Sequence, residues 1–100
     1  MGTDPLRELD EPSAALRILL ELSRNPQGIN VTALYDSMSS RGAGRTTVES
    51  SRRALVKAGL ASEYSQVDGR GRRFVILETT SLGSEVAQKI EDIEKIMGKA

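Results

Sequence analysis

The stretch that decides the fold is residues 45–77, RTTVESSRRALVKAGLASEYSQVDGRGRRFVIL. Residues 45–58 predict a helix, and Gly59 follows at the position where a left-handed backbone conformation commonly ends one. Residues 60–67 and 73–77 predict two strands, and the DGRG sequence between them predicts a tight hairpin turn. The stretch therefore predicts a helix followed by a two-stranded hairpin.

Two further helices are predicted before this stretch. Ser13 is a candidate N-cap, and the apolar residues of 15–22 follow with helical spacing until the NPQG sequence at 25–28 ends the helix. Asn30 is the candidate cap of a second, short helix, in which the apolar residues of 31–38 share one face. A turn of small and polar residues separates this helix from residue 45.

One more helix is predicted after the hairpin, from Thr79 or Thr80 to about Met97. Four apolar residues form a heptad-like stripe on it, with spacings of 4, 3 and 4 residues. They are Val86, Ile90, Ile93 and Met97. The stripe either packs on the first helix of its own chain or forms a homodimer interface, and we expect the homodimer.

Composition excludes several classes of function. The chain has 100 residues, which suits one domain, and it contains neither cysteine nor histidine. Thiolate metal sites, disulfides and imidazole acid–base chemistry are therefore excluded, and we expect a protein that is not an enzyme and has no cofactor or bound metal. No apolar run has the length of a membrane span, and the first residues do not resemble a secretion signal. We expect a cytoplasmic protein without membrane contact.

The zero net charge conceals an uneven distribution. Residues 40–75 carry eight basic and three acidic side chains, a net charge of +5, whereas residues 1–12 have a net charge of −3 and residues 76–100 one of −2. Seven of these eight bases are arginine, the residue that suits bidentate contact with phosphates and base edges. The alternative is a solvated basic face without a partner.

The order of these elements resembles the winged helix-turn-helix fold, and more closely the small prokaryotic or archaeal transcriptional regulators of the MarR/ArsR-like group. Residues 28–34 resemble the entry into the family's second helix, and residues 45–60 its recognition helix and exit. Residues 68–73 resemble its wing tip, and residues 80–86 the start of its last helix. The resemblance implies an α+β, mainly helical fold with a two-stranded hairpin wing and a C-terminal amphipathic helix.

This resemblance divides the chain into three parts. Residues 1–12 form a flexible or short helical arm, residues 13–80 form the winged-helix DNA-binding domain, and residues 81–100 form a dimerisation helix packed on the same domain. The implied function is sequence-specific binding of double-stranded DNA by a homodimeric transcriptional regulator, with residues 45–58 in the major groove and residues 66–73 on the backbone or in the minor groove.

The candidate DNA-binding residues fall into two groups. On the helix predicted at 45–58, small hydroxyl residues and one arginine share the side opposite Val48 and Leu55, which suits close approach to base edges. These candidates for base readout are Thr46, Thr47, Ser50 and Arg53. The candidates for phosphate contact are Arg41, Arg45, Arg70, Arg72 and Arg73.

Residues 51 and 52 depart from the pattern of the family. The resemblance implies a large aliphatic residue facing the core there, but the chain has Ser51 and Arg52. Either the core is thin at this point or Arg52 is sheltered against a partner side chain. The remaining alternative for the whole chain is a winged helix that contacts another protein in a larger assembly, which an exposed apolar patch would indicate.

Overall fold

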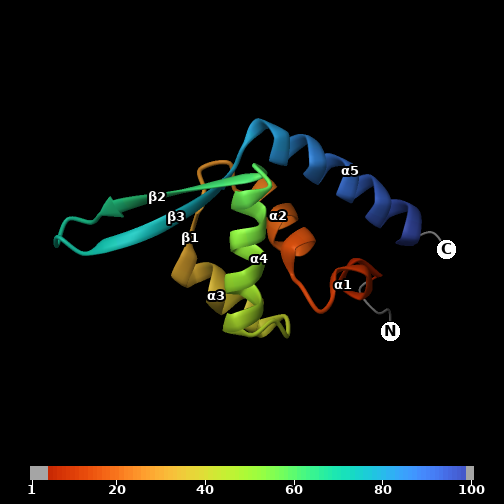
Figure 1. Ribbon diagram of the computed structural model, residues 1–100, viewed down its shortest axis with the longest axis horizontal. Coiled ribbons are helices and arrows are strands. Elements are labelled where there is room, and N and C mark those ends of the chain that lie inside the picture. Colours follow the sequence, from red (N-terminus) through yellow and green to blue (C-terminus); the bar gives the residue numbers. More distant parts are fainter. Residues whose placement is uncertain (1–4, 99–100) are drawn as a thin grey trace.

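The computed structural model describes residues 5–98 as an α+β arrangement that is mainly helical (Figure 1). Its elements are α1 (Pro5–Asp10), α2 (Ala15–Ser23), β1 (Ile29–Asn30), α3 (Val31–Ser40), α4 (Arg45–Lys57), β2 (Ala61–Val67), β3 (Arg73–Thr79) and α5 (Ser81–Gly98). The helices predicted from the sequence and the hairpin are all present, with ends that differ by a few residues.

The described strands form one antiparallel sheet in the order β1-β3-β2. β2 and β3 are paired over their whole length, from Ala61 opposite Thr79 to Val67 opposite Arg73. The two-residue strand β1 pairs with the other edge of β3, with Ile29 opposite Leu77. The sequence did not predict β1, because two residues are too short to show an alternating pattern.

The hydrophobic core lies where helices α2 to α5 meet the base of the sheet. Its fully buried side chains include Ile18, Leu19 and Leu22 of α2, Leu34 and Met38 of α3, Val48 of α4 and Leu77 of β3. The far half of the hairpin projects away from this core (Figure 1), and every residue from 62 to 73 is exposed. The molecule is therefore elongated, with principal extents of 50 × 27 × 21 Å.

Three element boundaries follow from local chemistry that the sequence predicted. The Asn30 side chain accepts a hydrogen bond from the backbone N–H of Thr32 at 2.9 Å and so caps α3. Gly59 follows α4 with a φ of +77°, the left-handed conformation expected there. The Thr80 hydroxyl accepts a hydrogen bond from the N–H of Gly83 at 3.0 Å, in the first turn of α5.

Gly83 also lets α5 pack closely on the start of β2. A Cβ atom at this position would lie 1.9 Å from the carbonyl oxygen of Leu60, a distance that no side chain tolerates. The hydroxyl of Thr80 donates to the carbonyl of Gly59 at 2.7 Å beside this contact. The C-terminal end of α4 and the N-terminal end of α5 are therefore in direct contact.

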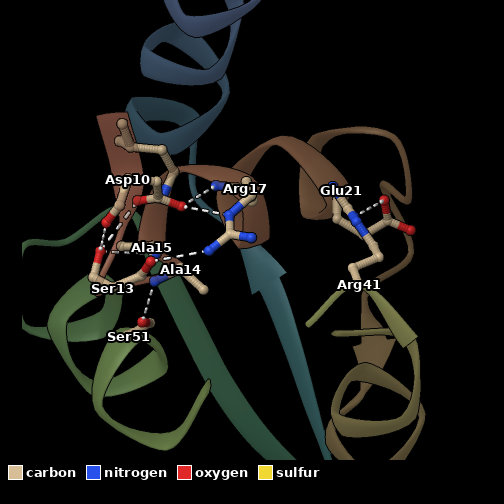
Figure 2. A network of polar contacts seen from close by, with 9 residues as sticks. Asp10, Ser13, Ala14, Ala15, Arg17, Glu21, Arg41 and Ser51 are labelled. Carbon is tan, nitrogen blue, oxygen red and sulfur yellow. Dashed lines mark hydrogen bonds and ion pairs between the residues drawn. The ribbon is translucent and has the colours of Figure 1, made fainter. Parts of the chain in front are cut away.

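The prediction that Ser13 caps the first long helix is confirmed only in part. α2 begins at Ala15, and the Asp10 carboxylate accepts hydrogen bonds from the N–H groups of Leu16 at 3.0 Å and Arg17 at 3.1 Å (Figure 2). Ser13 lies one residue before the N-cap position, and its hydroxyl accepts a hydrogen bond of 3.4 Å from the N–H of Ala15 while it donates to the backbone oxygen of Asp10 at 2.9 Å. A carboxylate suits the free N–H groups and positive end of the helix dipole.

The segment 1–12, expected to be a flexible or short helical arm, contains α1. Leu6 of α1 is buried in the core, whereas Leu9 is 59% exposed. Residues 1–4 of that arm, and residues 99–100 of the expected dimerisation helix, lie outside the described residues.

Candidate nucleic-acid interface

The outer face of α4 corresponds to the face that the sequence analysis expected to contact DNA bases. Val48, Ser51 and Leu55 of this helix are buried, so the side chains on the opposite side of the helix are turned to solvent. They border an open hollow of about 400 Å³. Its lining residues are Arg45, Thr46, Glu49, Ser50 and Arg53.

Of the base-readout candidates, Thr46, Ser50 and Arg53 are exposed, and Thr47 is half-buried at the edge of the same face. The Ser50 hydroxyl donates to the carbonyl of Thr47 at 3.2 Å, one turn earlier in the helix. Arg53 is the longest donor among these four candidates, with 76% of its side chain exposed. The structure thus brings three of the four candidates to one lining, with Thr47 beside them.

The contacts of Ser51 explain why residue 51 is not the large aliphatic residue that the family pattern implies. Ser51 is buried, and its hydroxyl accepts a hydrogen bond of 2.9 Å from the backbone N–H of Ala14 (Figure 2). A leucine there would leave that N–H without a partner where α4 meets the beginning of α2. The core is polar at this point because the Ser51 hydroxyl accepts a hydrogen bond from the N-terminal end of α2.

Arg52 is sheltered within its own chain. Its side chain is 14% exposed and forms ion pairs with Glu63 of β2 at 2.6 Å and with Glu49 at 2.9 Å. Burial opposes its positive charge, but the charges of Glu63 and Glu49 raise the pKa of Arg52 above its ordinary value. This arginine joins α4 to the hairpin and is not among the free donors of the surface.

Glu49 is the central acceptor of this face. It accepts hydrogen bonds from the hydroxyl of Tyr35 in α3, from Arg52 at 2.9 Å, and from Arg53 at 3.4 Å. The hydrogen bond from Tyr35 lowers the pKa of the Glu49 carboxyl; burial opposes this, and the charges of Arg52 and Arg53 add to it. The sequence analysis did not assign Glu49 a role, although its position four residues before Arg53 on a helix predicts an ion pair between them.

Two of the candidate phosphate contacts, Arg41 and Arg45, lie on either side of the turn between α3 and α4. The guanidinium of Arg45 lies 4.8 Å from the centre of the Tyr35 ring, a cation–π distance, and Arg45 remains exposed. Arg41 is half-buried, and its Nη1 lies 3.7 Å from a carboxylate oxygen of Glu21 in α2 (Figure 2). Arg41 is therefore turned partly toward α2, while Arg45 stays on the α4 face.

The remaining candidate arginines lie at the far end of the hairpin. Arg70, Arg72 and Arg73 are all exposed, and none of the ion pairs among residues 5–98 involves them. Asp68 organises the turn, because its carboxylate accepts from the N–H groups of Arg70 at 2.8 Å and Arg72 at 2.9 Å. The tip thus presents three arginine side chains on a defined turn.

The predicted stripe on the last helix is divided between the core and the surface. Ile90 is 4% exposed and packs in the core, Val86 and Met97 are half-buried, and Ile93 is 45% exposed. Leu82 and Ile96, at 51% and 68%, are more exposed than any of the four predicted residues. The structure therefore does not bring the four predicted residues together on one exposed face.

A buried ion pair near α1 has a structural role. Arg17 Nε lies 3.1 Å from Asp10 Oδ2, with side-chain exposures of 3% and 1%, and a second Arg17 nitrogen donates to the carbonyl of Ser13 at 3.0 Å (Figure 2). This network holds α1 to α2 at the same corner where Ser51 meets Ala14. Sequence reasoning missed it because both residues read as ordinary surface charges.

Residues 5–98 contain no group of three or more acidic, histidine or cysteine side chains that could hold a metal ion. No helix among them has the length and apolar character needed to cross a bilayer. Comparison with known proteins found no matching family model, no matching curated protein and no matching solved structure.

Proposed function

We propose that this protein is a winged helix-turn-helix protein that binds double-stranded DNA as a homodimeric transcriptional regulator. The fold supports the proposal through its order: α2, α3 and α4 are followed by a hairpin, and β1 after α2 joins the outer edge of that hairpin. In this assignment α3 and α4 form the helix-turn-helix, α4 is the recognition helix, and the turn between β2 and β3 is the tip of the wing.

The observation that carries the proposal is the position of the arginines. The exposed face of α4 presents Arg45 and Arg53, and the hairpin tip presents Arg70, Arg72 and Arg73, all outside the core. Two separate cationic elements on a projecting hairpin and a helix suit a polyanion that both touch. Net charge alone does not support this, because the whole chain is neutral.

The two groups have different roles in this proposal. Arg45, Arg70, Arg72 and Arg73 contact phosphates, which gives affinity without sequence preference, and Arg41 adds to them when its weak pairing with Glu21 opens. Thr46, Thr47, Ser50 and Arg53 face the base edges. The hydroxyl residues are short, so the helix axis approaches the groove closely, and Arg53 reaches furthest.

We infer that the dimer forms through a stripe of α5 that keeps Val86 and Ile93 of the predicted stripe and leaves out Ile90 and Met97. Ile90 is buried in its own chain, so the partner meets the neighbouring face instead. The exposed or half-buried apolar residues that share this face, with spacings of 4, 7 and 3 residues, are Leu82, Val86, Ile93 and Ile96. A two-fold dimer would place its recognition helices about 34 Å apart and would bind a pseudo-palindromic site.

A second candidate function is a winged helix that contacts another protein. It is favoured by the apolar surface of the hairpin, where Val67 is 60% exposed and Tyr64 36% exposed. Exposed apolar side chains on a projecting ribbon suit a protein partner better than a phosphate backbone. The exposed arginines at the same tip favour DNA.

Binding to a random-sequence DNA duplex, measured by fluorescence anisotropy across a salt series, tests the proposal. The oligomeric state is measured by light scattering on the same sample. We expect log K to fall steeply and linearly with log salt concentration, because each neutralised phosphate releases counterions. A folded dimer that does not bind at low salt would contradict DNA binding and would favour the protein-contact function.

A further inference from the structure

Glu49 is an acidic residue in the middle of a surface that otherwise suits DNA. It lines the hollow of α4 together with Thr46, Ser50 and Arg53. A carboxylate at this place repels phosphates, so its presence lowers affinity for any DNA sequence. The contacts of the Glu49 carboxylate indicate a role that offsets this loss of affinity.

Both oxygens of the Glu49 carboxylate are occupied. One oxygen accepts from Arg52 at 2.9 Å and from Arg53 at 3.4 Å, and the other accepts from the hydroxyl of Tyr35. A carboxylate has about four acceptor sites, and the three hydrogen bonds to Glu49 leave little capacity to accept from the amino group of cytosine. Glu49 is therefore poorly suited to direct base contact.

The carboxylate is itself held from two sides. Tyr35 belongs to α3, and its ring also contacts the guanidinium of Arg45. Arg52 is fixed in turn by Glu63 of β2 at 2.6 Å. Because donors anchored in α3 and β2 hold the carboxylate, it is a fixed point on the recognition face.

Arg53 contacts this fixed carboxylate from the solvent side. It is 76% exposed, and only one of its terminal nitrogens contacts Glu49. A guanidinium has five N–H donors in a planar fork, so the other donors remain available for a planar partner. The contact with Glu49 restricts the rotamers of a long exposed side chain and thereby lowers the entropy lost on binding.

We propose that Glu49 determines specificity by positioning Arg53 for bidentate contact with a guanine edge, without contacting DNA itself. This inference rests on the proposed function. It adds that the protein's preference at one base pair depends on a contact between two residues of α4, and that Tyr35 supports this contact from α3. Glu49 thus lowers general affinity for DNA and raises discrimination between sequences.

The experiment begins with selection of a preferred duplex from a random pool by the wild-type protein. Affinities for that duplex, for its single-base variants and for the random pool are then measured for Glu49→Gln, Arg53→Ala and the double variant. Tyr35→Phe removes one hydrogen bond to Glu49 without changing any charge. Glu91→Gln is the charge-matched control, because Glu91 lies on α5 and its side chain is 36% exposed beside Arg24. Thermal unfolding of every variant shows whether it folds.

We expect Arg53→Ala to lose about tenfold in preference for guanine at one position, and Glu49→Gln to lose most of the same preference at the same position. The double variant loses no more than Arg53→Ala alone. Glu49→Gln binds the random pool about two- to fivefold more tightly because a negative charge is removed. Tyr35→Phe lowers the preference without this gain, and Glu91→Gln changes neither.

Three results would overturn the inference while leaving DNA binding intact. Glu49→Gln could keep the wild-type preference, it could weaken all duplexes equally, or its effect could add to that of Arg53→Ala. Failure of the wild-type protein to bind or select any duplex contradicts the proposed function itself. The two failures are therefore distinguishable.

Discussion

The hydroxyl of Ser51 accepts a hydrogen bond of 2.9 Å from the backbone N–H of Ala14, 37 residues earlier in the chain. This contact joins the buried side of α4 to the first residue before α2 (Figure 2). Ala14 has no side chain that could cap its helix, so the N–H groups there depend on Ser51, Ser13 and Asp10. The orientation of α4, and hence of its exposed face, is coupled to the start of the first long helix.

Replacing Ser51 by alanine should destabilise the protein by about 1–3 kcal/mol, because the N–H of Ala14 would remain buried without an acceptor. The measurement is urea unfolding followed by circular dichroism. Ser62→Ala, at an exposed position of β2, is the control and should change the free energy of unfolding by less than about 0.5 kcal/mol. Equal stability of the two variants would show that the contact contributes nothing.

The contacts of Glu49 predict a dependence of stability on pH. Its pKa is lowered in the folded protein, so the folded chain binds this proton less readily than the unfolded chain does. The stabilisation is present above the pKa of an unfolded glutamate, about 4.3, and is lost as the pH falls through the lower pKa of the folded state.

The check is the melting temperature of the wild-type protein and of Glu49→Gln between pH 3 and pH 7, a range that brackets the ordinary pKa of about 4.3. The difference between the two proteins should be constant at neutral pH and should shrink at the acid end. A difference that stays constant throughout would mean that the carboxylate does not titrate as the contacts require.

Arg70 should act on DNA through phosphates alone. Arg70→Ala should weaken binding to all duplexes similarly and should reduce the slope of log K against log salt by about one. Anisotropy titrations at several salt concentrations measure both quantities. Lys89→Ala, at an exposed position of α5, removes the same charge outside the candidate DNA-binding residues and is the control. A selective loss at one base pair would contradict a phosphate role for Arg70.

The exposed stripe of α5 should hold the dimer. Replacing Ile93 and Ile96 together by glutamate should give a monomer by light scattering while the melting temperature of the fold is retained, because these side chains are 45% and 68% exposed. Val67→Glu, at a residue 60% exposed on the hairpin, is the matched control and should leave the dimer intact. A dimer that survives both substitutions on α5 would place the interface elsewhere.

Local patterns accounted for most of the secondary structure. The helical spacing of 31–38, the cap at Asn30 and the glycine at the end of α4 are all properties of neighbouring residues, and the structure confirms them. The capping of α2 by Asp10 could not be found in this way, because Asp10 reaches the helix across a turn. The strand β1 needed the edge of β3 before its two residues had a partner.

The candidate site also has features that local sequence patterns predict and features that depend on tertiary packing. The chain order by itself determined that an arginine-rich segment would consist of a helix and a hairpin, because turn residues and apolar spacing act over a few residues. Only the tertiary structure decided which charges remain free: it pairs Arg52 with Glu63, ties Arg53 to Glu49, and turns Ile90 into the core instead of toward a partner. Contacts between residues far apart in sequence depend on how the helices and the sheet pack, and no periodicity within one segment records that packing.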